Sequence, residues 1–266
     1  DGPMSILRWT FLTGYFLLTL LPLSWLVLTS LKTRGDAIST TPKVLPSITM
    51  PQEDDTIRFP MTRAGYRRLA EPHVGTTQSF FSYLLNSIIT GLVSTVAAVA
   101  LGTACAYGFS RFRVAGARDW LFFILSTRFL PPLAVVVPVL MMYREFDLQN
   151  THLGLILLYT SFNLSLAVWL MKGFIDEIPR AYEEAALVDG YSHLHVFWAI
   201  IVPRARTGMA VTGVFCLISA WNEYAFALTL NNAGAVTVPV YFAGLQGNIQ
   251  GMPWPQIAAG VLLYVT

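Results

Sequence analysis

Long apolar runs almost without charge constrain this chain more than any other feature. Crossing the roughly 30 Å hydrocarbon core of a bilayer takes about 20 apolar residues in a helix, and five runs meet that length. Three of them carry no charge, and the other two carry one each, Arg128 and Glu223. A sixth run begins near Gln256 and is still apolar at Thr266, so we expect that helix to continue in the native protein. The expected spans cover residues 9–31, 83–109, 120–143, 153–171, 208–230 and 256–266.

Composition supports a membrane location. Apolar residues make up 55% of the chain and charged residues 12%, against roughly 25% charged in soluble domains. The net charge of +2 is too balanced for a nucleic-acid surface. Cys105 and Cys216 both fall in apolar segments without ligand-like neighbours, so no metal site is expected. We therefore predict one all-α, polytopic membrane domain over residues 1–266.

The connections between spans predict an orientation. The link at residues 110–119 is short and basic, whereas residues 231–255 contain no Lys or Arg, which places the first in the cytoplasm and the second outside. The connection at residues 32–80 is rich in proline and mixed charge, so we expect an irregular extracytoplasmic loop. Its seven basic residues weaken the charge argument for that orientation.

Two spans carry features of helices that pack inside a bundle. The second has a small residue at every fourth position, which lets another helix approach closely. The third contains three prolines, which remove backbone donors and predict a kink in its middle. Small residues are also common in membrane helices that pack against nothing in particular, and that interpretation stays open. The small residues are Ser94, Ala98, Gly102 and Ala106, and the prolines are Pro131, Pro132 and Pro138.

The polar link at residues 176–203 is too ordered for a simple connector. Pro179 suits the first turn of a helix, and Gly190 suits its C-terminal end, so we expect a helix from Arg180 to Asp189. Ser192 is a good N-cap for a second helix that runs to Pro203. The link therefore predicts two helices joined by a tight turn at the membrane surface.

The first of these helices has the features of a docking element. Adjacent Ala185 and Ala186 leave its backbone accessible to the cleft of another protein, and Glu183 or Glu184 is available to an arginine there. A passive surface elbow has the same outline. A DNA-reading helix-turn-helix is disfavoured, because both helices are tethered to membrane spans and the face is acidic.

The link also resembles a known signature. Glu184-Ala185-Ala186, then Gly190, Ile200 and Val202-Pro203, are similar to the EAA motif of permease subunits of binding-protein-dependent ABC importers, with Val202 where leucine is usual. Further matches follow the order seen in carbohydrate-importer permeases related to the second membrane subunit of the maltose system. The resemblance covers the chain from Tyr66 onward, while the preceding stretch is longer and more polar than that pattern. The further matches are Asn86-Ser87, Ala106-Tyr107-Gly108 with Arg111-Phe112, Asn150-Thr151 and Trp221-Asn222-Glu223.

The resemblance implies a six-helix type I permease in a bacterial inner membrane. It implies pairing with a second, non-identical permease, two ATPase subunits beneath, and an extracytoplasmic solute-binding protein above. The chain has no G-x-x-x-x-G-K-S/T phosphate loop, so ATP and Mg²⁺ would be bound by the ATPase and no cofactor by this chain. The segment that contacts the ATPase would include Glu183, Glu184, Ala185, Ala186, Asp189, Gly190, Ile200 and Pro203.

Polar residues inside the spans are candidates for a solute pathway. Arg128 and Glu223 lie at membrane depth, where charges usually face a bundle interior or a wet cavity. An ion pair or a helix cap that only holds the bundle together is the alternative. Asn163, Asn222 and Tyr224 add hydrogen-bonding groups suited to a solute rich in hydroxyls, although polar contacts between helices have the same signature. The solute implied by the resemblance is carbohydrate-like, and sugar, polyol, glycerol and modified sugars all stay open.

Three classes of function fit these observations to different degrees. An ABC importer permease fits best. A secondary transporter that uses Arg128 and Glu223 in an ion or proton relay is the runner-up. An integral membrane enzyme is disfavoured because the spans hold no group of His, Cys, Asp or Glu, and His193 and His195 lie on the link.

Overall fold

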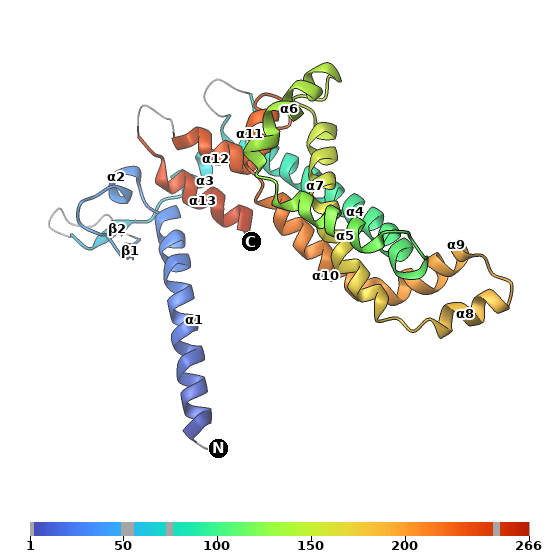
Figure 1. The fold of residues 1–266 in the computed structure, drawn as a ribbon. Helices are drawn as coiled ribbons and strands as arrows, with labels where there is room; N and C mark the ends of the chain where they lie inside the picture. Colours follow the sequence, from blue (N-terminus) through green and yellow to red (C-terminus); the bar gives the residue numbers. More distant parts are fainter. Residues whose placement is uncertain (1–2, 49–55, 73–76, 247–250, 266) are drawn as a thin grey trace. The chain divides into compact units, whose positions relative to one another are not determined.

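The structure of the chain is a computed structural model that describes residues 3–48, 56–72, 77–246 and 251–265. Those residues are mostly helical (Figure 1), which confirms the predicted helical membrane fold. The chain divides into two compact units, which are described separately. One comprises residues 1–84 and 241–266, and the other comprises residues 85–240.

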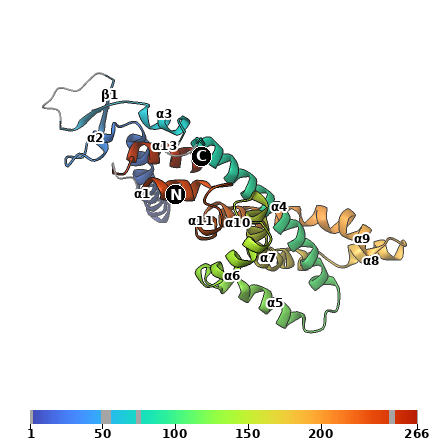
Figure 2. The same ribbon diagram turned by 90° about the horizontal axis from the view of Figure 1, so that it is seen from above.

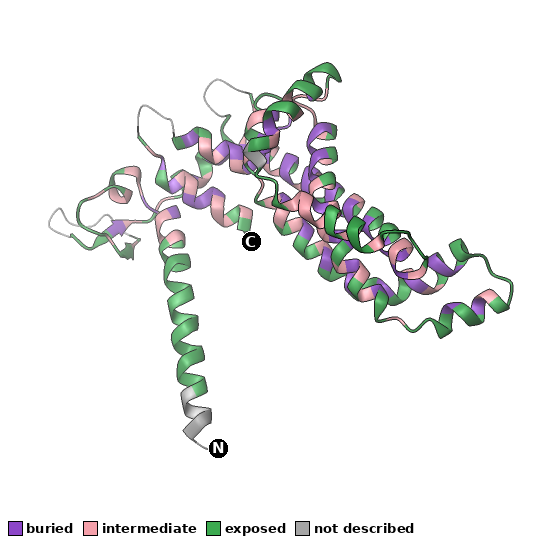
Figure 3. Cartoon of the chain, viewed as in Figure 1, coloured by how far each residue is buried: buried purple, intermediate pink, exposed green. Residues whose placement is uncertain are grey.

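Four helices among the described residues are long and apolar enough to cross a membrane. They are α1 (Pro3–Ser30), α4 (Phe80–Arg111), α7 (His152–Asp176) and a helix over residues 193–221 that ends as α10 (Val202–Trp221). From Trp9 to Val27, α1 exposes most of its apolar side chains (Figure 3), a surface matched to hydrocarbon rather than water.

The third predicted span is broken, as its prolines indicated. It consists of α5 (Ala117–Ser126), a 3₁₀ turn (Thr127–Phe129) and α6 (Pro132–Glu145), and the two arms meet at 92°. Pro131 is extended, and Pro132 opens α6 at a position where its missing N–H costs no helical hydrogen bond. Pro138 lies inside α6 without ending it.

The core of the 85–240 unit lies where α4, α7 and α10 pack together, side by side in Figures 1 and 2. Gly102 of α4 faces Ala167 of α7 so closely that an added Cβ would lie 2.6 Å from the Ala167 Cβ. Ala98, also on α4, is buried beside Ala167 and Cys216. The small-residue stripe therefore forms a close helix contact, which confirms that α4 is packed inside a bundle.

The structure corrects both ends of the fifth predicted span. The second helix of the link does not stop at Pro203, because the helix runs without interruption from His193 through α9 (His193–Val196) and a π-helical turn (Phe197–Ile201) into α10. The π turn carries the bond from the Val202 N–H to the Phe197 carbonyl, and Pro203 follows in the first turn of α10. At the other end the helix stops at Trp221 and restarts as α11 (Ala225–Leu230), so residues 208–230 are not one helix.

The unit of residues 1–84 and 241–266 corrects the prediction of an irregular loop at residues 32–80. That segment contains α2 (Arg34–Ala37), a parallel pair of short strands, β1 (Leu45–Ser47) and β2 (Arg58–Pro60), and α3 (Ala64–Ala70). The Thr33 side chain caps α2 by accepting the Asp36 N–H, and Phe59 and Leu69 of this segment are fully buried.

The C-terminal helices of this unit are α12 (Val238–Gln246), whose residues from Tyr241 onward lie in it, and α13 (Trp254–Val265). α13, which is the predicted sixth span, is apolar and packs against α1 and α3. Gly65 of α3 permits this packing, because an added Cβ there would lie 2.9 Å from the Pro255 carbonyl carbon.

Candidate solute cavity and coupling segment

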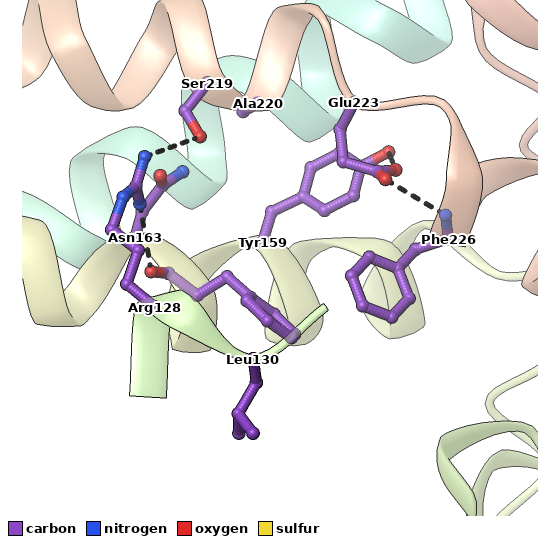
Figure 4. Close-up of a pocket in the computed structure, with 9 residues that line it drawn as sticks. Arg128, Leu130, Tyr159, Asn163, Ser219, Ala220, Glu223 and Phe226 are labelled. Atoms are coloured by element: carbon purple, nitrogen blue, oxygen red, sulfur yellow. Dashed lines mark hydrogen bonds between the residues drawn. The ribbon is translucent and has the colours of Figure 1, made fainter. Parts of the chain in front are cut away.

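A cavity of about 200 Å³ opens in the 85–240 unit where the broken span meets α7, α10 and α11 (Figure 4). The break between α5 and α6 brings Arg128 and Leu130 to one side. α7 supplies Tyr159 and Asn163, which are four residues apart and therefore on one helix face. The end of α10 and the start of α11 close the remaining side. The lining residues are Arg128, Leu130, Tyr159, Phe162, Asn163, Ser219, Ala220, Glu223 and Phe226.

Arg128 reaches into this cavity from the 3₁₀ turn. Its Nη1 donates to the Phe162 carbonyl at 3.4 Å and its Nη2 donates to the Ser219 hydroxyl at 3.5 Å. Both hydrogen bonds are long, and a guanidinium has five N–H donors in a fixed fork. Arg128 can therefore offer strong donors to a molecule that enters the cavity.

Glu223 has a different role in the same cavity. Its carboxylate accepts the backbone N–H groups of Phe226 at 3.0 Å and Ala227 at 3.1 Å, and the Tyr159 hydroxyl at 3.2 Å. Two of these donors belong to the first turn of α11, where helical N–H groups have no intrahelical partner. Glu223 therefore caps α11 and joins it to α7.

Asn163 is the most buried polar side chain in the cavity wall, with 2% of its surface exposed. Its Nδ2 donates to the Cys216 carbonyl of α10 at 3.2 Å, which ties α7 to α10. Its Oδ1 is buried without a hydrogen-bond partner among the residues that the structure describes. An unpaired buried acceptor costs stability, so the Oδ1 would gain from a hydrogen bond with any donor that reaches it.

The structure brings together three of the five predicted pathway residues, namely Arg128, Asn163 and Glu223. Asn222 and Tyr224 are exposed and do not line the cavity, and the Asn222 amide donates to the Ile218 carbonyl of its own helix at 2.8 Å. Sequence reasoning missed Tyr159 and Ser219. Tyr159 lies one helical turn before Asn163 on α7, and that i, i+4 spacing is the signal that could have identified it. Ser219 lies four residues before Glu223 in the sequence, but α10 ends between them.

The predicted docking helix is present as α8 (Ala181–Val188) at one end of the 85–240 unit, next to α9 in Figure 1. Gly190 follows it with φ +87°, the left-handed conformation that glycine adopts without strain. Asp189 is the C-cap of α8, and Ser192 caps α9 by accepting the His195 N–H at 3.3 Å. The first helix, the turn at Gly190 and the N-cap at Ser192 thus lie where the sequence predicts them.

The faces of α8 differ from each other. Glu184 and Ala185 are exposed, and Val188 is 87% exposed. Glu183 and Ala186 are instead buried against this chain, where Glu183 forms an ion pair with Arg111 at the end of α4. Of the two glutamates considered for a partner's arginine, Glu184 is the one that points outward. Further along, Ile200 is half-buried and Pro203 is exposed.

Comparison with known proteins identifies relatives along most of the chain. Residues 98–266 match the family model described as "Binding-protein-dependent transport system inner membrane component". The trehalose transport system permease protein SugB of Mycobacterium tuberculosis is 34% identical over 96% of this chain and 85% of its own length. The probable ABC transporter permease protein y4oR of Sinorhizobium fredii is 31% identical over 93% of this chain and 82% of its own length.

The fold also matches a solved structure. A chain of a bacterial ABC transporter involved in the import of the acidic polysaccharide alginate superposes with a TM-score of 0.74 at 20% identity, covering 98% of this chain and 91% of that one. At that identity the likeness shows the fold. With the sequence relatives and the family match, it shows that this chain belongs to the binding-protein-dependent transport system inner membrane components, as a multi-pass permease subunit of an ABC importer whose ATPase is a separate subunit.

Proposed function

We propose that this permease imports a carbohydrate-like solute and that the cavity around Arg128 and Asn163 lies on the solute's path. The observation that carries the proposal is the cavity's mixed chemistry at membrane depth. A guanidinium, an amide and the Tyr159 and Ser219 hydroxyls stand beside the rings of Phe162 and Phe226, which pack with centroids 4.8 Å apart. The hydroxyl groups of a sugar both donate and accept hydrogen bonds, so they suit the polar side chains of the cavity. The apolar face of the sugar ring suits the two aromatic rings.

Relatives of the chain support this class of solute. Besides the trehalose permease, a diacetylchitobiose uptake permease of Streptomyces coelicolor is 29% identical over 87% of this chain. A proton relay between Arg128 and Glu223 is less favoured, because the Glu223 carboxylate already accepts two backbone amides and a hydroxyl. Glu223 is therefore better suited to holding α11 than to exchanging protons.

A transport assay on cavity variants tests the solute pathway. In the complete complex reconstituted in vesicles, Asn163→Leu and Arg128→Met should each reduce uptake of the sugar that the wild type takes up best from a panel of mono- and disaccharides. The matched control is Ser161→Ala, because Ser161 lies on the same helix, is exposed, and donates to the Leu157 carbonyl of its own helix at 2.8 Å. Wild-type uptake by both cavity variants at equal subunit content would contradict the proposal.

We further propose that the importer contains a second, non-identical permease, two ATPase subunits that bind ATP and Mg²⁺, and an extracytoplasmic solute-binding protein. The exposed face of α8, with Glu184, Ala185 and Val188, is the surface that meets the ATPase. Asp189 and Gly190 end and turn this helix, and the continuous helix from His193 through Ile200 and Pro203 joins it to the membrane. A short helix with a small residue and an acid facing outward suits a cleft that carries an arginine.

The docking face has its own test. Ala185→Trp adds bulk at the exposed face, and Glu184→Lys reverses its charge, so each should release the ATPase from the purified complex or abolish solute-stimulated ATP hydrolysis. Glu145→Lys, an equal charge reversal at an exposed position at the end of α6, is the control. Full ATPase retention and stimulation in both α8 variants would remove this docking face from consideration.

A further inference from the structure

Arg111, at the end of α4, contacts the segment around α8 at several points. The Arg111 Nε bonds to Oε1 of Glu183 in the first turn of α8, and Nη2 donates to the carbonyls of Ile175 at 3.0 Å and Ile178 at 2.8 Å. Both charged side chains are 7% exposed, so they form a buried ion pair. Arg111 thereby contacts the C-terminal turn of α7, the residues after it, and the start of α8 together.

The chemistry of arginine explains why one side chain can make these contacts. A helix leaves its last carbonyls without intrahelical donors, and a cation near them is stabilised by the helix dipole. An acid in the first turn of α8 is favoured by the opposite end of that helix's dipole. Only the planar guanidinium fork serves both acceptor sets at fixed angles, since a lysine ammonium is a point charge on a flexible stem.

A second set of hydrogen bonds runs in parallel with Arg111. The Arg180 side chain, just before α8, donates to the Ser110 carbonyl at 2.9 Å, and the Ser110 hydroxyl donates to Asp176 at 2.7 Å. Asp176 also pairs with Lys172 at 2.5 Å. The ends of α4 and α7 and the start of α8 are therefore cross-linked in several directions by charge-assisted hydrogen bonds.

Along the chain, the connection from α8 to α10 has another kind of structure. It passes through Gly190, whose positive φ relies on glycine, and then through the π-helical turn of residues 197–201. An added Cβ at Gly190 would meet nothing within 4 Å. The buried charged contacts of α8 thus run to α4 and α7, while Arg204 of α10 stacks on the exposed Tyr182 ring of α8 at 3.6 Å. Of these helices, α7 carries Tyr159 and Asn163 of the cavity.

We propose that Arg111 is a positioning residue that fastens α8 to the cytoplasmic ends of α4 and α7, so that a displacement of α8 moves those two spans with it as one body. This inference rests on the proposed role of α8 as the ATPase contact. In it, Arg111 transmits motion from α8 to α7, which lines the cavity. If the Arg111–Glu183 pair only stabilises the fold, weakening it would lower the stability of the subunit but would not change the amount of solute moved per ATP hydrolysed.

The first test measures coupling directly. In the reconstituted complex, Arg111→Lys keeps the charge and loses the fork, so the amount of solute moved per ATP hydrolysed should fall by about two- to thirtyfold, the range seen for changes in coupling networks. Arg113→Lys is the matched control, because Arg113 is exposed two residues further on. Equal solute-to-ATP ratios in Arg111→Lys and wild type, with all subunits retained, would overturn the proposal.

The second test does not depend on activity. Spin labels at Val188→Cys on α8 and Val114→Cys after α4, in a complex with Cys105→Ala and Cys216→Ala, report the separation of the two elements, and both labelled positions are exposed. We expect a narrow distance distribution that is the same with and without nucleotide, and a broad or nucleotide-dependent one when Arg111→Lys or Glu183→Gln is added. A distribution unchanged by both variants would show that the ion pair does not hold α8 to α4.

The two tests separate this inference from the proposed function. If α8 does not meet the ATPase, Ala185→Trp and Glu184→Lys will leave the ATPase bound and stimulated, whatever the label distances show. If α8 meets the ATPase but Arg111 does not transmit its motion, those two variants will uncouple the complex while Arg111→Lys behaves as wild type.

Discussion

Arg128 and Glu223 line the same cavity, but each bonds to other partners (Figure 4). Arg128 donates to the Phe162 carbonyl and the Ser219 hydroxyl, and Glu223 accepts from Tyr159 and the first turn of α11. The ion pairs found among the described residues lie elsewhere in the chain, at Lys43–Asp36, Arg111–Glu183 and Lys172–Asp176. The two charges therefore have separate roles, which single substitutions can tell apart.

Replacing Glu223 with alanine should destabilise the membrane subunit. The change leaves two N–H groups of α11 and the Tyr159 hydroxyl without their acceptor, and the loss of a helix cap typically costs about 1–2 kcal/mol. We expect a lower thermal unfolding temperature of the purified complex together with reduced transport, while the ATPase stays bound. Thr229→Val is the control on α11, because the Thr229 hydroxyl donates within that helix, to the Ala225 carbonyl at 2.8 Å. An unfolding temperature equal to wild type would show that the cap contributes nothing.

Replacing Arg128 should affect transport more than stability. Its two hydrogen bonds are 3.4 and 3.5 Å long, so their loss should change the free energy of unfolding by under about 1 kcal/mol. We expect Arg128→Met to keep a near-wild-type unfolding temperature and to raise the solute concentration needed for half-maximal uptake. The opposite result, a large loss of stability with unchanged uptake, would assign Arg128 a structural role.

Sequence reasoning located most of the membrane helices because a bilayer imposes a length and a composition on every span. It placed the turn at Gly190 and the cap at Ser192 for an equally local reason, since both depend on backbone geometry within a few residues. The break after Trp221 was missed. A hydropathy run shows that a segment is apolar, but it does not show where a helix within that segment stops. The Glu223 carboxylate at this break also accepts from Tyr159, which lies 64 residues away along the chain.

The candidate site was only half predictable for a related reason. Charged and amide residues inside a span stand out in a sequence, so Arg128, Asn163 and Glu223 were found. Whether a polar residue at the end of a helix faces the bundle depends on where that helix stops. Asn222 and Tyr224 lie in the break between α10 and α11, and the broken helix leaves both exposed, outside the cavity lining. The burial of Glu183 depends on Arg111 and had no local sign.

The contact between α4 and α7 predicts opposite effects for two glycines on the same helix. An added Cβ at Gly102 would lie 2.6 Å from the Ala167 Cβ and 3.0 Å from the Ala167 backbone, whereas one at Gly108 would meet nothing within 4 Å. Gly102→Ala should therefore destabilise the bundle by about 1–3 kcal/mol through overpacking. Gly108→Ala should be neutral or stabilising by up to about 1 kcal/mol, because alanine favours helix over glycine. Unfolding of both variants in detergent distinguishes them, and equal stabilities would refute the close contact.

We expect Asp36 to stabilise the unit formed by residues 1–84 and 241–266, and we expect acid to remove this stabilisation. Burial would raise the pKa of the Asp36 carboxyl, but hydrogen bonds from Lys43 at 2.6 Å and Thr33 at 2.5 Å, with the Lys43 charge, outweigh it and hold the pKa below its ordinary value. A carboxyl group whose pKa is lowered in the folded state stabilises the fold, and its contribution is complete at pH values above the unfolded-state pKa of about 3.9. The contribution is lost as the pH falls through the folded-state pKa.

The measurement is unfolding as a function of pH. Wild type should lose stability as pH falls through the lowered pKa of Asp36, and Asp36→Asn should be less stable at neutral pH and less sensitive to acid over that window. Asp119→Asn, at an exposed carboxylate in the first turn of α5, is the control. Parallel pH profiles of wild type and Asp36→Asn would mean that the contacts with Lys43 and Thr33 do not stabilise the fold.

Substitutions at Gly190 test the backbone conformation of the turn after α8 separately from the effect of side-chain size. Its φ of +87° is strained for residues with a Cβ, although a side chain there would meet nothing within 4 Å, so any effect of substitution comes from the backbone. Asparagine tolerates the left-handed conformation, whereas valine does so poorly, with a penalty of roughly 1–2 kcal/mol. We expect Gly190→Asn to retain solute-stimulated ATP hydrolysis and Gly190→Val to lose it or release the ATPase, since the turn sets how α8 is presented. Both variants add a side chain to the same open space, so equal stimulation in the two would show that the geometry of this turn is not required for coupling.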